Sequence, residues 1–265
     1  MKVQVLMSTM NQNSIDFYKE KGLKTDAIII NQTDVFSYES KTIEEKKIEM
    51  FSYNELGVGR SRNSALLKSN ADICLMADDD MKYVPNYEQI VLKAFHDHPK
   101  ADVILFNVGI ENEFGEMNYK IKNNKKINYT NYMKFGTVNI AFRREKVINN
   151  HIFFSLLFGG GAKYGSGEDT LFLTDCLKKG LTIYSTPEII AYIHYRKSSW
   201  FSGYNEKYFY DKGALYRAIS NTFCPFLILY FTLKKRKKLT QLNFWRALCM
   251  GWKGSRDYKK LLKKA

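Results

Sequence analysis

Residues 73–80 of the chain read ICLMADDD, an apolar run that ends in three consecutive aspartates, Asp78, Asp79 and Asp80. An unbroken apolar run of this length is typical of a strand buried on both faces of a parallel sheet. Ligands of such sheets bind beyond the carboxyl ends of the strands, where the aspartates stand. Because three adjacent carboxylates repel one another, we expect a cation beside them, and oxygen ligands favour Mg²⁺ or Mn²⁺. The alternative is a solvated turn or a helix cap after the strand.

Apolar and amphipathic segments alternate on both sides of this run, which predicts an α/β fold with a mostly parallel sheet. The polar residues 111–132 are expected to form a loop or a pair of strands. We expect further strands over residues 3–7, 26–30, 47–51, 103–108, 136–142, 182–184 and 189–193, and helices after Ser14, after Gly57, over 87–98, from Arg143 and over 170–179.

The 265-residue chain is long enough for one large domain with an appendage, and its positive charge lies at one end. Residues 196–265 hold 17 basic and 3 acidic side chains, a net charge of +14, whereas residues 1–195 hold 24 of each. This asymmetry indicates two tasks in one chain. The four cysteines are scattered, as in a reducing compartment, and the chain enters a strand at once, so we expect a cytoplasmic protein without a signal peptide.

Six short motifs follow one another along residues 2–200. They are the strand end Ser8-Thr9, Asp34 after the second strand, Gly57-Val58-Gly59-Arg60-Ser61-Arg62-Asn63, the three aspartates, Gly165-Ser166-Gly167-Glu168-Asp169 and His194. In this order they resemble the motifs of family 2 glycosyltransferases, which have the GT-A fold. The resemblance implies a nucleotide-diphosphosugar donor and a divalent metal ion.

The resemblance also assigns residues to the donor. Residues Ser8, Thr9 and Asp34 would line the nucleoside pocket, and Asp78 would face the ribose or the donor sugar. Asp79 is a further candidate for nucleotide-sugar binding. The glycine-rich motif would add Gly59, Arg60 and Asn63, because a guanidinium group pairs well with phosphate. Each part of this motif has a structural alternative to donor binding. The glycines Gly57 and Gly59 could form a tight turn before a helix, and Arg62 and Asn63 could be a helix-surface residue and a polar contact to a loop.

The metal ligands implied by the resemblance are Asp80, Asp78 and His194. Asp78 and Asp80 match the family's Asp-x-Asp motif, with Asp80 expected on the metal. A cation there would neutralise the charge that develops on a departing nucleoside diphosphate. Ala77 departs from the pattern, since an acidic residue is often found there, and the third aspartate leaves the register open by one residue. His194 has an ordinary structural role as its alternative, and Arg196 or Lys197 is expected to reach phosphate.

The second chemical centre is Glu168-Asp169, at the start of a predicted helix. Acidic residues in this position are stabilised by the helix dipole, so capping is the structural alternative. Inverting transfer needs a carboxylate that takes the proton of the acceptor hydroxyl. The resemblance places this base at Asp169, with Glu168 and Gly167 against the acceptor. A helix N-terminus lowers a carboxyl pKa, which does not suit a base unless burial opposes it.

The last 60 residues differ in character. Residues 223–233 are apolar, too few for the roughly 20 that span a bilayer, and the basic run 234–238 follows at once. Residues 242–262 form a second amphipathic stretch rich in aromatic and basic side chains. Such segments are typical of helices that lie in a membrane interface. The alternative is a pair of helices that pack on the main domain with solvated basic faces.

We therefore predict a GT-A-like α/β fold, with a mostly parallel sheet flanked by helices and a C-terminal helical basic and aromatic extension. Residues 1–108 would form the nucleotide-sugar-binding half, 109–204 the acceptor-binding and catalytic half, and 205–265 a membrane-associating extension. The predicted activity is metal-dependent inverting transfer of a sugar from a nucleotide-diphosphosugar, a UDP-sugar, to a glycan or lipid-linked glycan. The protein would work at the inner, anionic face of the cell membrane.

The richness in Lys, Asn and Ile suggests an AT-rich bacterial genome and a role in capsule or other cell-surface polysaccharide synthesis. One alternative function is a metal-dependent nucleotide-sugar or phosphate hydrolase that uses the aspartates. The other is a basic nucleic-acid-binding protein. The chain contains no recognised nucleic-acid motif, so we expect no nucleic-acid partner.

Overall fold

The computed structural model describes residues 1–195, 203–239 and 242–263. The strands are β1 (Val3–Met10), β2 (Asp26–Gln32), β3 (Ser37–Ile43), β4 (Lys46–Tyr53), β5 (Ile73–Asp78), β6 (Met81–Tyr83), β7 (Val103–Glu111), β8 (Met117–Asn118), β9 (Lys125–Ile127), β10 (Ile140–Arg143) and β11 (Ile183–Ile193). The α-helices are α1 (Val58–Lys68), α2 (Tyr87–Asp97), α3 (Arg144–Asn149), α4 (Glu168–Lys178), α5 (Glu206–Ile219), α6 (Cys224–Lys235) and α7 (Phe244–Leu262), and the 3-10 helices are η1 (Ile15–Lys21), η2 (Tyr132–Lys134), η3 (Thr137–Asn139) and η4 (Arg236–Lys238).

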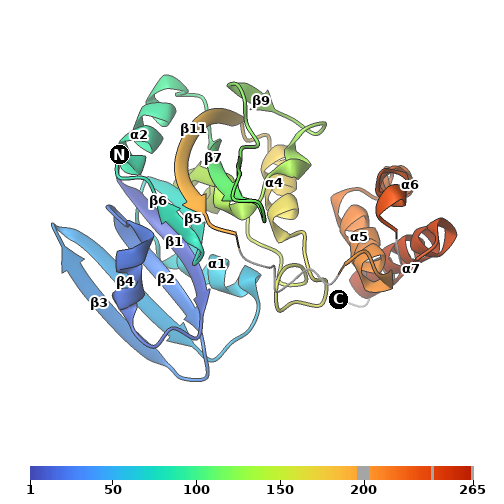
Figure 1. The fold of residues 1–265 in the computed structure, drawn as a ribbon, viewed down its shortest axis with the longest axis horizontal. Helices are drawn as coiled ribbons and strands as arrows, with labels where there is room; N and C mark the ends of the chain where they lie inside the picture. The colour runs from blue at the N-terminus through green and yellow to red at the C-terminus, as the bar shows by residue number, and fades with distance from the viewer. Residues whose placement is uncertain (196–202, 240–241, 264–265) are drawn as a thin grey trace.

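One sheet organises the first 195 residues, in the strand order β3-β4-β2-β1-β5-β10-β7-β11-β6 (Figure 1). Strands β4, β2, β1 and β5 run parallel, as do β7 and β11, and the antiparallel β10 lies between the two groups. The edge strands β3 and β6 are antiparallel to their neighbours. The mostly parallel sheet predicted from the sequence is confirmed, and the carboxyl ends of β1, β2, β5, β7 and β11 lie at one edge.

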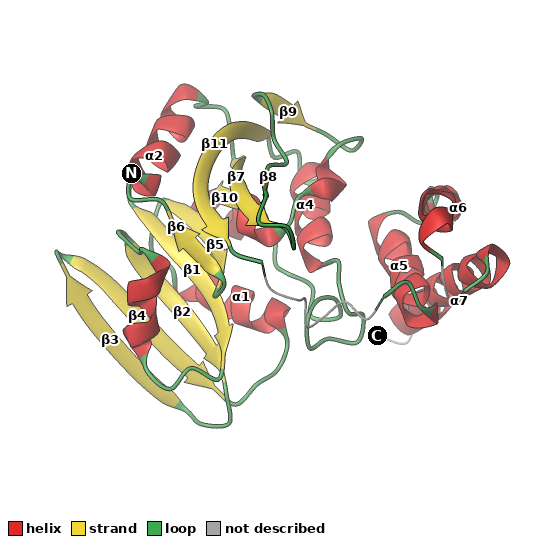
Figure 2. Cartoon of the chain, in the orientation of Figure 1, coloured by secondary structure: helices red, strands yellow, loops and turns green. Residues whose placement is uncertain are grey.

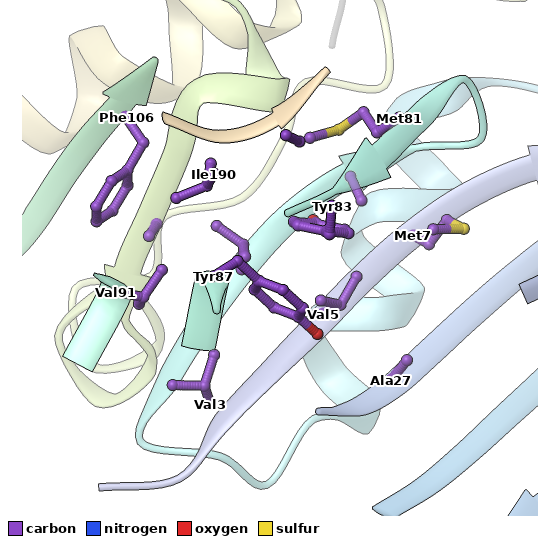
Figure 3. Close-up of a cluster of buried hydrophobic side chains, with 14 of the residues drawn as sticks. Val3, Val5, Met7, Ala27, Met81, Tyr83, Tyr87, Val91, Phe106 and Ile190 are labelled. Carbon is purple, nitrogen blue, oxygen red and sulfur yellow. The ribbon is translucent and has the colours of Figure 1, made fainter. Parts of the chain in front are cut away.

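Both faces of the sheet are covered, which explains the unbroken apolar strands. Alternate residues of β1 belong to different cores: Val5 and Met7 pack beneath α2, and Leu6 packs with α1 and α4. Figure 3 shows the first core, where Tyr87 lies against the β1 side chains. The Tyr87 hydroxyl lies 2.7 Å from Thr25 Oγ1, so this buried phenol is hydrogen-bonded.

Two expectations about local structure need correction, and one strand was not expected. Residues 136–142 do not form one strand, because the Asn139 side chain bonds the Phe106 carbonyl and the Gly136 amide, which favours the 3-10 turn η3 before β10. The two strands expected over 182–193 are one strand, β11, whose register shifts around Pro187, a residue that cannot donate to the ladder. Edge strand β3 was not predicted, since its exposed polar residues lack apolar alternation.

Helices α5, α6 and α7 form a separate group beside the sheet, named here the C-terminal helical unit (residues 203–239 and 242–263; Figure 2). Its core includes Leu215, Ile228 and Leu248, and it continues into Phe158 and Tyr164 of the loop before α4. The predicted helical extension is thus confirmed, and its helices pack on the main domain. Within the described residues, no helix combines the length and the apolar character that crossing a membrane requires.

Candidate active site

A cavity of about 1100 Å³ opens at the carboxyl edge of the sheet. Its wall includes the ends of five strands and the start of α4. Nine of the residues predicted for the site line it: Ser8, Thr9, Asp78, Asp79, Asp80, Gly167, Glu168, Asp169 and His194. The topology therefore brings the aspartate cluster and the Glu168-Asp169 pair to one cavity, although about 90 residues separate them in the sequence.

The two acidic centres are joined by Arg62, a residue that the sequence analysis did not place in the site. Its side chain is only 4% exposed and lies 2.9 Å from Asp78 Oδ1 and 2.7 Å from Glu168 Oε1. Burial acts to lower the pKa of Arg62, but the charges of Asp78 and Glu168 outweigh it and raise that pKa. The cation expected beside the aspartates is therefore supplied in part by the protein itself.

The orientation of α1 explains why Arg62 was missed. Successive helical residues are about 100° apart, so Arg60 and Arg62 point in nearly opposite directions. Arg60 is exposed, whereas Arg62 shares the buried face of Ala65 and Leu66. The helical spacing of Arg62 with these two apolar residues was the signal that could have identified it.

Four predicted donor residues do not line the cavity. The first is the exposed Arg60. The second, Gly59, is buried, and a Cβ there would overlap the Ser155 carbonyl oxygen, so close packing explains this glycine. Asn63 bonds the backbone amide and carbonyl of Phe154, which is the loop contact considered as its alternative. Asp34 is exposed in the turn after β2, and Gln32, at the strand end, lines the cavity in its place.

The aspartates are held by short contacts to neighbouring elements. Thr9 Oγ1 donates to Asp79 Oδ2 at 2.6 Å, and Ser61 Oγ on α1 donates to Ser8 Oγ at 2.8 Å. Together with the Arg62–Asp78 pair, these bonds tie β1, β5 and α1 at the cavity wall. The side chains at the strand ends are thus pre-positioned rather than freely solvated.

Asp169 lies in the first turn of α4, where Gly167 with φ 120° sets the direction of the chain. Its Oδ1 accepts a hydrogen bond of 2.6 Å from the Thr170 amide. Burial and the adjacent charge of Glu168 raise the pKa of Asp169 to about 6, although the Thr170 bond and Arg62 oppose this. Burial therefore outweighs the helix N-terminus, and the carboxyl is tuned closer to neutral pH.

His194 lines the cavity just beyond β11, and its Nδ1 lies 3.1 Å from Glu111 Oε2 at the end of β7. The imidazole is 70% exposed, which excludes a buried core role and leaves a surface residue as the structural alternative. In the part of the chain that the structure describes, no three His, Cys, Asp or Glu side chains form a preassembled metal site. Arg196 and Lys197, predicted to reach phosphate, lie outside the described residues.

This fold, with a cavity that gathers carboxylates at the end of a mostly parallel sheet, is the GT-A fold of glycosyltransferases. The model of the family described as glycosyl transferase family 2 matches residues 37–158. Residues 37–158 thus match the family that the motifs indicated, and the chain is a glycosyltransferase that transfers sugar from a nucleotide-sugar.

Solved structures agree with this fold. Residues 1–349 of S. aureus TarS in complex with UDP-GlcNAc superpose with a TM-score of 0.65 at 13% identity, over 100% of this chain and 92% of that one. The corresponding complex with UDP gives a TM-score of 0.62 at 13% identity, with the same coverage of both chains. By sequence, the chain matches no curated protein.

Proposed function

We propose that this glycosyltransferase inverts the anomeric centre, uses Asp169 as general base, and takes its sugar from a UDP-sugar. One observation carries the proposal: Asp169 and the aspartates 78–80 line the same cavity. The similarity to a fold that binds UDP-GlcNAc and UDP in S. aureus TarS supports the choice of nucleotide. The acceptor is a hydroxyl group of a glycan or of a lipid-linked glycan.

The chemistry at Asp169 follows from its surroundings. Thr170 engages Oδ1, so Oδ2 is the atom that receives the proton of the acceptor hydroxyl. The acceptor oxygen then forms its bond to the anomeric carbon while the bond from that carbon to the diphosphate oxygen breaks. A base is most effective when its pKa lies near the working pH, and the raised pKa of about 6 serves this. The nucleoside diphosphate leaves with the electron pair of the broken bond.

The residues at the cavity fit a divalent cation, Mg²⁺ or Mn²⁺. Mg²⁺ is usually held by one or two carboxylates together with substrate phosphates, so a preformed cluster of three protein ligands is not required. Asp80 would hold the ion, with Asp78 and His194 as further ligands. The Glu111 contact at Nδ1 of His194 suits a metal-ligating histidine, because such residues usually donate their other ring N–H to a carboxylate. When bound, the ion would neutralise charge on the leaving diphosphate.

The test of the base is Asp169→Asn in the full chain. Transfer should fall at least 100-fold, the lower end of what a general base contributes, while UDP binding measured by calorimetry is retained. Asp175→Asn is the matched control, because Asp175 lies on the same helix outside the cavity wall and should transfer normally. Normal transfer by Asp169→Asn would show that another group is the base.

The acceptor requirement separates transfer from hydrolysis. A nucleotide-sugar hydrolase releases nucleoside diphosphate with water alone, whereas a transferase releases it faster when the acceptor is added. UDP release should therefore rise with added glycan acceptor in the native chain and stay low in Asp169→Asn. Release that is independent of every acceptor would favour the hydrolase.

We further propose that the C-terminal helical unit binds the anionic inner face of the cell membrane. Apolar side chains at a helical spacing of three or four stand exposed on α6 and just before it, at 64%, 70%, 64% and 51%: Phe223, Phe226, Tyr230 and Leu233. The basic run 234–238 follows directly, so apolar surface and positive charge adjoin, as anionic interfaces favour. Exposed Trp245 and Trp252 on α7 are of the type enriched at interfaces.

Vesicle co-sedimentation tests this surface. The full chain should pellet with vesicles that contain anionic lipid and should stay in solution with purely zwitterionic ones. The double variant Phe226→Glu/Tyr230→Glu should lose binding, whereas Phe36→Glu, which changes an equally exposed aromatic residue beside β3, should not. Pelleting of the double variant would exclude α6 as the contact. A lipid-linked acceptor for cell-surface polysaccharide would suit an enzyme held at that surface.

A further inference from the structure

The Gly165–Gly167 turn, which leads into the helix of the proposed base Asp169, is held by the C-terminal helical unit. Helix α5 of the C-terminal helical unit contacts each of its three residues, Gly165, Ser166 and Gly167. Asp211 Oδ2 accepts a hydrogen bond of 2.9 Å from the Gly165 amide, and Lys212 Nζ donates one of 3.2 Å to Ser166 Oγ. A Cβ at Gly167 would lie 2.7 Å from Leu215 Cδ1, so α5 packs directly on the turn.

The two charged residues that make these contacts, Asp211 and Lys212, are largely removed from water. Asp211 is only 7% exposed, although it also accepts a bond of 2.6 Å from Lys207 Nζ. Burial acts to lower the pKa of Lys212, and the charges of Asp169, Glu168 and Asp211 act against it. Removing charges from water costs free energy unless they find partners, and Lys212 finds its partners at the catalytic turn.

The position of α5 is fixed by close packing on α7. A Cβ at Gly213 would overlap the Gly251 carbonyl oxygen, and a Cβ at Gly254 would overlap the Tyr210 carbonyl oxygen. The two helix backbones therefore approach as closely as glycine allows. Since α5 has little freedom to shift on α7, the residues that it presents to the turn are well placed to fix it.

We propose that Lys212 is a positioning residue for Asp169: α5 holds the Gly165–Gly167 turn and places the positive charge of Lys212 beside the base. This inference rests on the proposed function, because it takes Asp169 as the base. It gives the C-terminal helical unit a part in the reaction as well as in membrane binding.

Charged groups from four elements surround Asp169. Glu168 on α4 raises its pKa, while Arg62 on α1 and Lys212 on α5 lower it. Lys120, in the segment between β8 and β9, also interacts with Asp169. Removal of the Lys212 charge should therefore raise the pKa of Asp169 and move the acid limb of the pH–rate profile to higher pH.

The experiment measures kcat/KM for sugar transfer against pH in full-length Lys212→Met, Lys212→Arg and Lys253→Met. In Lys212→Met, the acid limb should move up by roughly half to one pH unit, and the rate at pH 6 should fall roughly two- to fivefold. Lys212→Arg keeps the charge and should restore the native limb. Lys253 is exposed on α7, and its substitution should leave the profile unchanged.

An acid limb of Lys212→Met that coincides with the native one overturns the proposal even where the rate falls, because lost packing lowers the rate equally at every pH. A shifted limb in Lys212→Arg also overturns it, because the charge would then not be the cause. Should Lys212→Met fold poorly, Lys212→Gln removes the charge and retains a donor for Ser166. Asp169→Asn, measured alongside, separates the two proposals: native transfer by that variant refutes the base, and an inactive Asp169→Asn with an unmoved limb refutes only the role of Lys212.

Discussion

The two parts of this molecule treat charge in opposite ways. Residues 1–195 carry equal numbers of acidic and basic side chains and bring the decisive ones inside, where Arg62 is buried between Asp78 and Glu168. Residues 196–265 carry the whole net charge of +14, much of it on solvated surfaces such as the basic run 234–238. An internal charge acts on its immediate neighbours, whereas a surface excess acts at long range and is screened by salt.

The contrast is not complete, because the basic part also places a charged side chain, Lys212, against the main domain. Lys212 donates to Ser166 in the Gly165–Gly167 turn, whereas Arg236, Lys237 and Lys238 of the basic run are exposed. The composition of the C-terminal helical unit suggests membrane binding alone, yet the unit also contacts the turn that leads into Glu168-Asp169.

The largest effect is expected at Arg62. Arg62→Met leaves Asp78 and Glu168 without their shared cation, which should lower the free energy of unfolding by roughly 3 kcal/mol. Sugar transfer should also fall at least 100-fold, since both acidic centres lose their link. The matched variant Arg60→Met alters an exposed residue of the same helix and should stay within about 0.5 kcal/mol. Urea unfolding measures both, and equal losses would refute the buried bridge.

The next effect is expected where α5 meets α7. Gly254→Ala places a methyl group against the Tyr210 carbonyl, which should separate the helices and cost roughly 1–3 kcal/mol of stability. If α5 positions the catalytic turn, transfer should fall as well, although Gly254 lies outside the cavity wall. Thermal unfolding measures the stability. If the variant is less stable but transfers sugar at the native rate, membrane binding is the only role left for the C-terminal helical unit.

Much of the fold was predictable because strand and helix formation depend on local patterns. The buried run 73–77, the helix after Gly57 and the strand at residues 3–7 all follow apolar spacing that survives in the structure. Edge strand β3 was not predictable in this way, because its polar residues are defined by pairing with β4 rather than by burial. The 3-10 turn η3 likewise depends on a bond from Asn139 to a distant strand.

The site was predictable in its acidic residues and less so in its basic ones. Asp78, Asp80 and Asp169 stand at strand or helix ends, where any parallel sheet gathers its ligands, so their positions follow from topology. To place Arg62 in the site, one must know which face of α1 turns toward the cavity, because its partners Asp78 and Glu168 come from β5 and α4. Lys212 required the tertiary contact of α5 with the turn at 165–167, which no local pattern encodes.

Added salt should weaken the vesicle binding of the C-terminal helical unit about 10-fold and change sugar transfer much less. Raising NaCl from 50 to 500 mM shortens the screening length to a few ångströms, so binding to anionic vesicles should weaken by about one order of magnitude. Sugar transfer to a soluble acceptor should change much less, because the cavity charges are paired at short range. Parallel vesicle sedimentation and transfer assays across the salt series would measure both. Equal salt dependence would mean that the surface charge also serves the reaction.

The smallest effect is a stability change at Asp169. Its folded pKa of about 6 lies above the ordinary value of 3.8, so the protonated form is favoured by folding. That contribution is present below about pH 4 and is lost as pH rises through 6. Asp169→Asn should therefore be more stable than the native chain at pH 8, by roughly 1 kcal/mol because the carboxyl is only partly buried, and close to it at pH 4. Urea unfolding at the two pH values measures this. An advantage that appears at pH 4 instead would reverse the sign of the shift and remove the physical basis for Asp169 as a base tuned toward neutral pH.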